Sequence, residues 1–246
     1  MWSRRGLYDA DGPMRTEDIE SRLRVSPLFR DVSAELLQRF ARETVARRFE
    51  DGQALWQPGE VATHLMIVLR GLVQVLRRAP SGDTTTLGIF GPRECVGTVA
   101  VLGRKVYPAE AVAQGDVVEL LAVRAEPVLF AMNGDPALAL AFNRSLCEQT
   151  TMLRSRIDVL SAGAVPQRLA MLLLHLAERF GDTDDAGGAH IPLPLSRVAL
   201  ARLVSARAET VIRVASDWQK RGLLTTDAAG FHLIDPAALQ AIADGQ

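Results

Sequence analysis

Residues 194–224 read PLSRVALARLVSARAETVIRVASDWQKRGLL, and this stretch decides the fold of the C-terminal part of the chain. Apolar residues recur at helical spacing in two segments, Ser196 to Leu203 and about Arg207 to Lys220, separated by a three-residue turn. Two short extended segments follow, Leu223 to Thr226 and Phe231 to Ile234, and the turn residues Asp227 to Gly230 between them indicate a hairpin. Helix, turn, helix and hairpin in this order is the layout of a winged helix-turn-helix.

The two helices need small apolar side chains where they cross. We expect Ala199 at the closest contact, because a bulky side chain there would push the helices apart. The full set of expected contacts is Val198, Ala199, Leu203, Val211 and Val214.

Charge supports a nucleic-acid partner for this segment. The whole chain carries a formal net charge of −1, so any binding to DNA must come from a local patch. Between Ser196 and Arg221 six basic residues face two acids, a local balance of +4. The bases are Arg197, Arg202, Arg207, Arg213, Lys220 and Arg221, and the acids are Glu209 and Asp217. A solvated helical face is the alternative for the charge alone.

The motifs of this segment resemble the DNA-binding domain of the Crp/Fnr superfamily of transcription regulators. The resemblance rests on Leu193 to Arg197, Ala199 to Ala201, Ala208 to Arg213 and Arg221 to Leu224. It extends upstream, where matching motifs stand in the same order: Ser26 to Phe29, Phe49 to Gly52, Pro58 to Glu60, Leu69 to Gly71 and Gly91 to Gly97. It covers the chain from about residue 20 and implies a DNA-binding regulator without catalytic activity.

The resemblance also implies which side chains read base edges. Glu209 and Arg213 match the family's reading pair, and they lie four apart, on one helical face. Arginine donates two bonds to guanine and glutamate accepts from cytosine. Ala208 stands where the catabolite-activator branch has an arginine, so we expect only apolar contact there, for example with a thymine methyl, and a half-site nearer TTGA than TGTGA. Arg197, Arg207 and Thr210 are the candidate phosphate contacts.

Upstream of this domain the pattern indicates an α+β chain with an N-terminal double-stranded β-helix, or jelly roll. We assign residues 1–20 to a flexible tail, with a helical pattern from Thr16, and residues 21–133 to a sensor domain resembling the cyclic-nucleotide-binding fold. Expected strands of about six residues alternate with turns, which is typical of a sandwich or barrel. The expected strands are His64 to Leu69, Leu72 to Arg77, Thr84 to Phe90 and Val117 to Val123. Ser33 is an expected helix N-cap.

Residues 134–163 predict a long dimerisation helix, and residues 164–246 form the winged domain. Asp135 suits the N-cap and Pro136 the first turn. Apolar and small residues then recur at alternating spacings of three and four, which defines a heptad seam. The seam is Asn143, Leu146, Thr150, Leu153, Ile157 and Leu160. The alternative is an amphipathic helix that lies on its own barrel. A twofold dimer implies an inverted-repeat operator in double-stranded DNA.

The segment that would hold an effector departs from the cyclic-AMP-binding relatives. In them a glutamate takes the ribose hydroxyl, and an Arg-Ser or Arg-Thr pair about ten residues later takes the cyclic phosphate. Here Gly97 is followed by Thr98 in place of the glutamate, and Pro108 and Ala109 replace the Arg-Ser pair. A buried phosphate without such a donor would be unpaired. We therefore predict that the usual cyclic-AMP mode is absent, and that an unidentified signal, or none, acts here.

Two other sensor chemistries stay open as alternatives. Haem ligation would use His64, because it is the sole histidine of the expected barrel. A redox role would use Cys95 or Cys147, although we expect Cys95 to be a small core residue, and Cys147 lies beside the seam. Two cysteines are too few for a disulfide framework or for an all-cysteine iron–sulfur cluster.

Composition excludes several other classes. No apolar run is long enough to cross a bilayer, and Met1 to Arg5 is not followed by an apolar signal core, so we expect a cytoplasmic protein without a membrane partner. A cupin-type metal enzyme would need several ligands inside the barrel, yet His175, His190 and His232 lie outside it. We expect no cofactor. RNA polymerase is the expected protein partner, and a pure interaction module, with a structural helix-turn-helix, is a further alternative.

Overall fold

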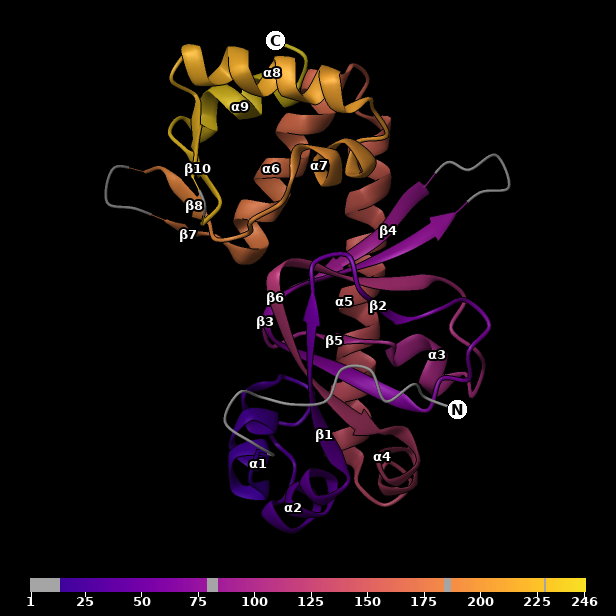
Figure 1. The fold of residues 1–246 in the computed structure, drawn as a ribbon. Coiled ribbons are helices and arrows are strands. Elements are labelled where there is room, and N and C mark those ends of the chain that lie inside the picture. The colour runs from indigo at the N-terminus through magenta and orange to yellow at the C-terminus, as the bar shows by residue number, and fades with distance from the viewer. Residues whose placement is uncertain (1–13, 79–83, 184–186, 228) are drawn as a thin grey trace. The chain divides into compact units, whose positions relative to one another are not determined.

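The computed structural model describes residues 14–78, 84–183, 187–227 and 229–246. The chain divides into two compact units, one of Met1–Arg77 and Leu87–Thr150, the other of Arg78–Thr86 and Thr151–Gln246. The first carries the N-terminal helices and most of a β-barrel, and the second carries a small sheet among helices (Figure 1). This confirms the α+β fold class with an N-terminal antiparallel β domain and a C-terminal helix-turn-helix.

Two short helices open the described chain. They are α1 (Thr16–Val25) and α2 (Ala34–Arg42), and the Ser33 hydroxyl accepts a hydrogen bond from the Leu36 amide at 3.3 Å, which confirms that N-cap. Ile19 of α1 is buried in the core of the unit. A flexible tail through residue 20 is therefore wrong for residues 16–20, because burial of Ile19 anchors the first turns of α1. Residues 1–13 of that expected tail lie outside the described residues.

Antiparallel strands form the barrel. They are β1 (Thr44–Glu50), β2 (Ala54–Trp56), β3 (His64–Arg78), β4 (Thr84–Phe90), β5 (Cys95–Val96) and β6 (Glu110–Arg124). Within the described residues they make a six-stranded sheet in the order β1-β6-β3-β4, with β2 added to β6 and β5 added to β3. Strand β6 pairs with β1, β2 and β3, and β3 pairs with β6, β4 and β5, so these two strands form the centre of the sheet.

The expected turn at Arg70 and Gly71 is wrong. Strand β3 runs through it without a break, and its pairing with β6 shifts register on either side of Arg70. Gly71 has φ +77°, and a Cβ there would lie 2.8 Å from the Val117 carbonyl oxygen. The glycine therefore serves a β-bulge in a long strand, where backbone packs against backbone, and not a hairpin.

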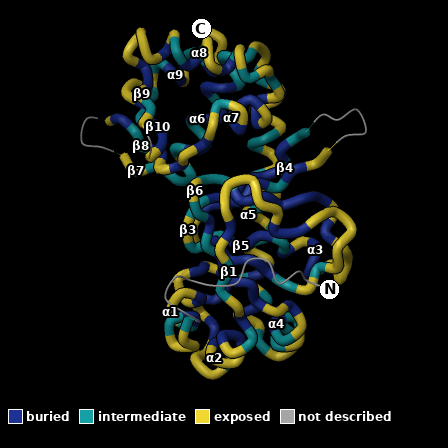
Figure 2. Tube along the Cα trace, viewed as in Figure 1, coloured by how far each residue is buried: buried dark blue, intermediate teal, exposed yellow. Residues whose placement is uncertain are grey.

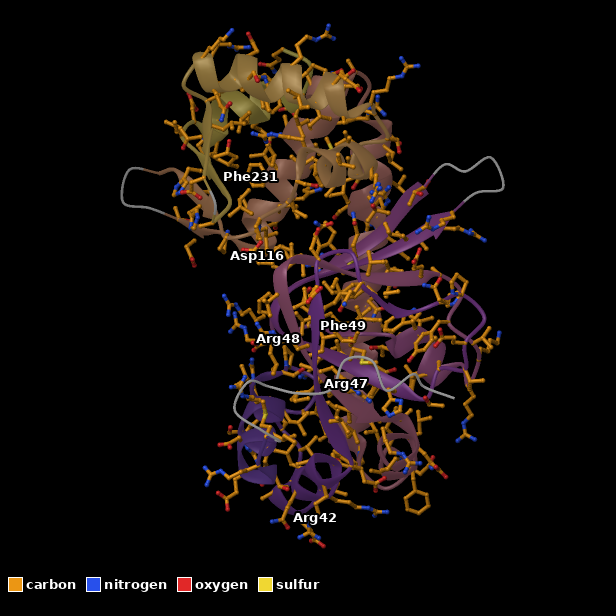
Figure 3. All side chains as sticks on the ribbon, viewed as in Figure 1. Arg42, Arg47, Arg48, Phe49, Asp116 and Phe231 are labelled. Carbon is orange, nitrogen blue, oxygen red and sulfur yellow. The ribbon has the colours of Figure 1, made fainter. Side chains whose placement is uncertain are left out.

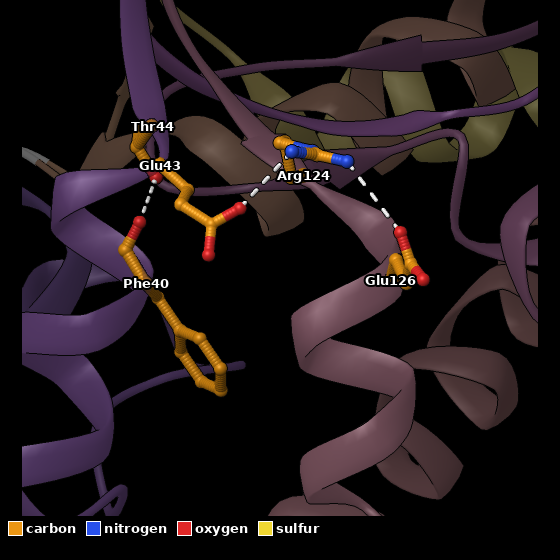
Figure 4. A network of polar contacts seen from close by, with 5 residues as sticks. All are labelled: Phe40, Glu43, Thr44, Arg124 and Glu126. Atoms are coloured by element: carbon orange, nitrogen blue, oxygen red, sulfur yellow. Dashed lines mark hydrogen bonds and ion pairs between the residues drawn. The ribbon is translucent and has the colours of Figure 1, made fainter.

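A polar network joins the barrel to its flanking helices (Figure 4). The Thr44 hydroxyl donates to the Phe40 carbonyl at 2.8 Å, which fixes the junction of α2 with β1. Arg124 contacts Glu43 at 3.2 Å and Glu126 at 3.4 Å, so the end of β6 is tied to both α2 and α4 (Ala125–Ala131). These ion pairs are substantially exposed, and pairs of this kind contribute about 0–1 kcal/mol each.

The long helix α5 (Pro136–Ser161) begins with the predicted cap. The Asp135 carboxylate accepts from the amides of Ala137 and Leu138 at 3.0 and 3.1 Å. Leu138 and Phe142 on its first turns are buried in the core of the N-terminal unit, Val159 is buried near its other end, and the residues between them are half-buried or exposed. Figure 2 colours the chain by this burial. The helix ends before Gly163, which has φ +87°, as expected.

The C-terminal unit places a four-stranded sheet beside helices. Its elements are α6 (Val165–Phe180), β7 (Asp182–Thr183), β8 (Ala189–Ile191), α7 (Arg197–Leu203), α8 (Ala208–Lys220), β9 (Leu224–Thr226), β10 (Phe231–Leu233) and α9 (Pro236–Ala243). Among described residues the sheet order is β7-β8-β10-β9, and each pairing is antiparallel. The β9–β10 hairpin confirms the expected wing, although Ala228 of its turn lies outside the described residues.

Candidate nucleic-acid interface

The helix-turn-helix is built from α7 and α8. The Ser196 hydroxyl caps α7 by accepting from the Ala199 amide at 3.1 Å. Ala199, Leu203 and Val211 are buried, as expected for the side chains at the crossing. Val198 is 49% exposed, so its expected place in the contact is wrong, and Leu200 is buried instead. The helical period explains this, because Val198 lies on the first turn of α7 and faces away from α8.

The turn between the helices ends α7 in a left-handed residue. Ser205 has φ +49°, and the Ala206 amide donates to the Ala201 carbonyl at 2.9 Å. This is the hydrogen bond of a Schellman cap, in which the left-handed position is usually glycine. The cap turns the chain sharply, and Arg207 then leads directly into α8.

The exposed surface of α8 carries the predicted reading pair. Glu209 and Arg213 are both exposed, one turn apart, whereas Val211 between them is buried against the rest of the unit. Ala208 is half-buried beside them. Sequence reasoning missed Ile212, which is 47% exposed on the same helix. Ile212 directly precedes Arg213 and falls outside the apolar face of the helix in the sequence pattern. This position could have identified it as an exposed apolar residue on the candidate DNA-facing surface.

The candidate phosphate contacts differ in exposure and in the contacts that their side chains already make within the chain. Arg207 is exposed and Thr210 is half-buried, both at the first turn of α8. Arg197 is half-buried, donates to the Thr226 hydroxyl at 2.9 Å, and lies 5.6 Å from the ring centre of Phe231, which is labelled in Figure 3. Burial lowers the pKa of this guanidinium. Arg197 thus fastens α7 to the wing strands β9 and β10.

The predicted seam of α5 faces outward from each compact unit. Leu153, Ile157 and Leu160 are 53%, 63% and 38% exposed, which is unusual for so many aliphatic side chains on one helix. Asn143 and Thr150 are also exposed, and Leu146 is half-buried. The Thr150 hydroxyl donates to the Leu146 carbonyl at 2.9 Å, so it needs no other acceptor.

The effector segment is packed closely. Gly97 has φ +92° and precedes α3 (Thr98–Leu102), whose Thr98 is fully buried. Pro108 is exposed, and Ala109 is buried and supplies a carbonyl that accepts from the Trp56 indole at 2.9 Å. The segment therefore presents neither a carboxylate at position 98 nor a guanidinium at position 108.

An aromatic pair that sequence reasoning missed lies against this segment. Trp56 and Tyr107 stack with ring centres 4.1 Å apart and are both buried. A Cβ on Gly97 would lie 3.3 Å from the Tyr107 ring and 3.7 Å from the Trp56 ring. The space next to Gly97, the first residue of the effector segment, is thus filled by the rings of Tyr107 and Trp56.

The three other candidate sensor residues lie in unlike surroundings. His64 is half-buried, its Nδ1 lies 2.9 Å from the Thr63 hydroxyl, and its pKa is lowered by burial and then by the charges of Arg124 and Arg47. Cys95 is buried, and burial raises the pKa of its thiol to about 12. Cys147 is exposed on α5. Among the described residues, no three His, Cys, Asp or Glu side chains gather closely enough to hold a metal ion.

The fold and the exposed surface of α8 define a winged helix-turn-helix domain that follows an N-terminal antiparallel β domain. The model of the cyclic nucleotide-binding domain matches residues 46–135, and that of the Crp-like helix-turn-helix domain matches residues 167–242. The chain belongs to the Crp/Fnr superfamily and is a transcription regulator with a helix-turn-helix DNA-binding domain.

Known relatives align along most of the chain. The CRP-like cAMP-activated global transcriptional regulator of Mycobacterium tuberculosis is 25% identical over 214 residues, which cover 86% of this chain and 94% of that protein. The global nitrogen regulator of a Nostoc species is 28% identical over 185 residues, 74% of this chain and 81% of its own. A crystal structure of a CRP-family transcriptional regulator from Thermus thermophilus superposes with a TM-score of 0.63 at 26% identity, covering 81% of this chain and 97% of that chain. Within the described part of this chain, no helix combines the length and apolarity that a membrane crossing requires.

Proposed function

We propose that the protein acts as a homodimer that reads an inverted repeat in double-stranded DNA through α8. The observation that carries the proposal is the exposure of Glu209 and Arg213 on one face of the second helix of a helix-turn-helix. In this motif the second helix enters the major groove, where each base pair presents a distinct set of donors and acceptors. A twofold dimer presents the face twice, so the operator is an inverted repeat.

Base reading divides among four side chains in this proposal. Arg213 donates to guanine O6 and N7, and Glu209 accepts from cytosine N4. Ala208 offers only a methyl group, which favours a thymine methyl over a guanine at that step and supports a TTGA-like half-site. Ile212 adds a second apolar contact on the same surface.

The phosphate contacts position the helix without specifying sequence. Arg207 and Thr210 fit this role, because both lie at the N-terminal end of α8, where amide groups and the helix dipole also favour an anion. Arg197 can contact a phosphate while it donates to Thr226, because a guanidinium carries five N–H donors.

The seam of α5 is where the second copy packs in this proposal. Exposed aliphatic residues at alternating spacings of three and four suit a two-stranded coiled coil, and burying them would remove several apolar side chains from water. We accordingly divide the chain into a tail (1–20, of which residues 16–20 lie in α1), a sensor domain (21–133), a dimerisation helix (134–163) and a winged domain (164–246).

We further propose that cyclic AMP does not act here in the usual mode. The Mycobacterium tuberculosis relative is named as cAMP-activated. In this chain the segment offers a buried Thr98, an exposed Pro108 and a buried Ala109, none of which supplies the charged partner that a cyclic phosphate needs. The residues present do not fit that nucleotide, so another signal acts at the sensor or none does. RNA polymerase is the proposed protein partner once the dimer is on DNA.

The test is duplex binding as a function of salt, with a TTGA-like inverted repeat and a scrambled duplex of equal length. A specific reader should bind the repeat at least a thousand-fold more tightly, in the range of about 10³–10⁷, and both affinities should fall steeply as salt rises. Sedimentation of the free and bound protein should give two chains per duplex. Equal affinity for both duplexes, or a one-to-one complex, would overturn the proposal.

A further inference from the structure

Two half-buried arginines hold the turn that precedes α8. Arg156, near the end of α5, donates from Nη1 to the Leu203 carbonyl at 3.0 Å. Arg168 of α6 donates from Nη1 to the Val204 carbonyl at 2.8 Å and to the Ser205 carbonyl at 3.4 Å. All of these residues belong to the C-terminal unit.

These three carbonyls are the ones that α7 cannot satisfy by itself. The last carbonyls of a helix have no amide donor from a following turn. The Schellman cap uses the Ala201 carbonyl, through the Ala206 amide, and leaves the carbonyls of residues 203–205 to other donors. The C-terminal end of a helix also carries partial negative charge, which favours a cation there.

Holding these carbonyls leaves other polar atoms of the two arginines without a partner. Burial lowers the pKa of Arg156, and its Nη2 and the Nε of Arg168 are buried without a hydrogen-bond partner. Within the described part of the chain neither guanidinium forms an ion pair with an acidic side chain. Two half-buried cations without an acidic partner are thus directed at the carbonyls of one turn.

Arg156 also borders the seam of α5. It stands three residues after Leu153 and four before Leu160, so it is a surface neighbour of both on the helix. Those two leucines are exposed and belong to the proposed dimer contact. A partner helix that covers them would pack beside the aliphatic stem of Arg156 and restrict its rotamers.

We propose that Arg156 is a positioning residue for DNA reading, which couples the packing of the α5 seam to the placement of α8 by holding the Leu203 carbonyl. This inference rests on the proposed function. Helix α8 begins at Ala208, three residues after the last held carbonyl, so a loosened turn displaces the first turn of the reading helix, where Glu209 lies. Base-edge contacts require side chains to be held within about 0.5 Å of their productive geometry.

The experiment compares three variants of the full-length protein. Arg156→Met keeps the length of the side chain and removes every N–H donor, and Arg156→Lys keeps a charge and a donor. Arg154→Met is the matched control, because Arg154 is exposed on the same helix. One measurement is amide hydrogen exchange, followed by NMR, at Ala206 and Val211, whose amides bond to Ala201 and Arg207. The other is the ratio of affinities for the inverted repeat and a scrambled duplex, with the association state checked by sedimentation.

We expect Arg156→Met to stay dimeric, to exchange these amides at least ten-fold faster, and to lose at least ten-fold in the affinity ratio. Arg156→Lys should recover part of both, and Arg154→Met should match the wild type. Unchanged exchange, or an equal loss of affinity for both duplexes, would overturn the inference, since the second outcome describes a simple charge contact. If the wild type itself prefers no repeat, the proposed function fails, and the exchange measurement still decides the role of Arg156. Should Arg156→Met not fold, Arg156→Leu, which also lacks every N–H donor, replaces it in both measurements.

Discussion

The ring of Tyr107 stacks on the ring of Trp56, with centres 4.1 Å apart and planes inclined by 13°. The Tyr107 hydroxyl donates to the His64 carbonyl at 2.7 Å, and the Trp56 indole donates to the Ala109 carbonyl. Both polar tips are thus satisfied while both rings are buried beside Gly97. The pair fixes the effector segment to β2 and to the start of β3, and it gives the sensor a measurable response to alkali.

We predict that stability falls between about pH 9 and pH 12. Burial raises the pKa of Tyr107 to about 12 and that of the nearby Cys95 thiol to about 12, from ordinary values of 10.0 and 9.0. In this range the unfolded chain releases protons that the folded chain keeps, so the unfolded state gains stability as pH rises. Each group contributes a slope of up to about 1.4 kcal/mol per pH unit.

Urea unfolding at several pH values measures this slope. Cys95→Ala and Tyr107→Phe should each flatten the fall, even where they lower the free energy of unfolding at pH 7. The matched control is Cys147→Ala, because Cys147 is exposed. A pH dependence that is the same in all four proteins would contradict the assignment of the alkaline loss to the buried groups.

We predict that Ser205→Gly stabilises the winged domain by about 0.5 kcal/mol. A left-handed residue other than glycine costs about 1–2 kcal/mol, and the greater freedom of glycine in the unfolded chain offsets part of the gain. Thermal unfolding of the full chain measures the difference. Ser205→Ala keeps the strained φ and should not stabilise, and a gain of equal size in that variant would show that relief of backbone strain is not the cause.

We predict that Ile212 contributes to sequence preference through a thymine methyl. A methyl group buried against this side chain is worth about 0.8 kcal/mol. Replacing thymines of the half-site one at a time by deoxyuridine removes only the methyl, and one position should lose about four-fold in affinity. With Ile212→Ala that loss should disappear, and Val198→Ala on α7, also an exposed aliphatic, is the control. Equal sensitivity to every deoxyuridine in both proteins would contradict the contact.

Features that depend on local sequence were predicted well, and features that depend on long-range packing were predicted poorly. The predicted caps at Ser33 and Asp135 depend on a side chain and an amide three residues or fewer away, so the sequence pattern contains them. The bulge at Gly71 resembles a turn in sequence, because both need a positive φ, and only the pairing with β6 distinguishes the two. The Trp56–Tyr107 stack and the bond from Arg156 to Leu203, 47 residues apart, join segments that no local pattern relates.

The proposed DNA-reading surface also combines features that local sequence predicts with features that only the folded structure reveals. The spacing of Glu209 and Arg213 follows from one helical turn, and their exposure could be predicted once the helix was recognised. Arg197 looked like a free base in the sequence, yet Thr226 and Phe231 reach it from the wing, which only the folded sheet brings into contact with α7. Ile212 was overlooked because an isoleucine in a helix normally faces the core.

The most direct test of the central claim is the affinity of Arg213→Ala for a set of operators in which the half-site guanine is replaced by each other base. Our account predicts that the wild type loses affinity at every replacement, by about 1–3 kcal/mol. The variant should bind the intact operator more weakly by a similar amount and show little preference at that one position. A variant that still discriminates against all three replacement bases as strongly as the wild type would contradict base reading by α8.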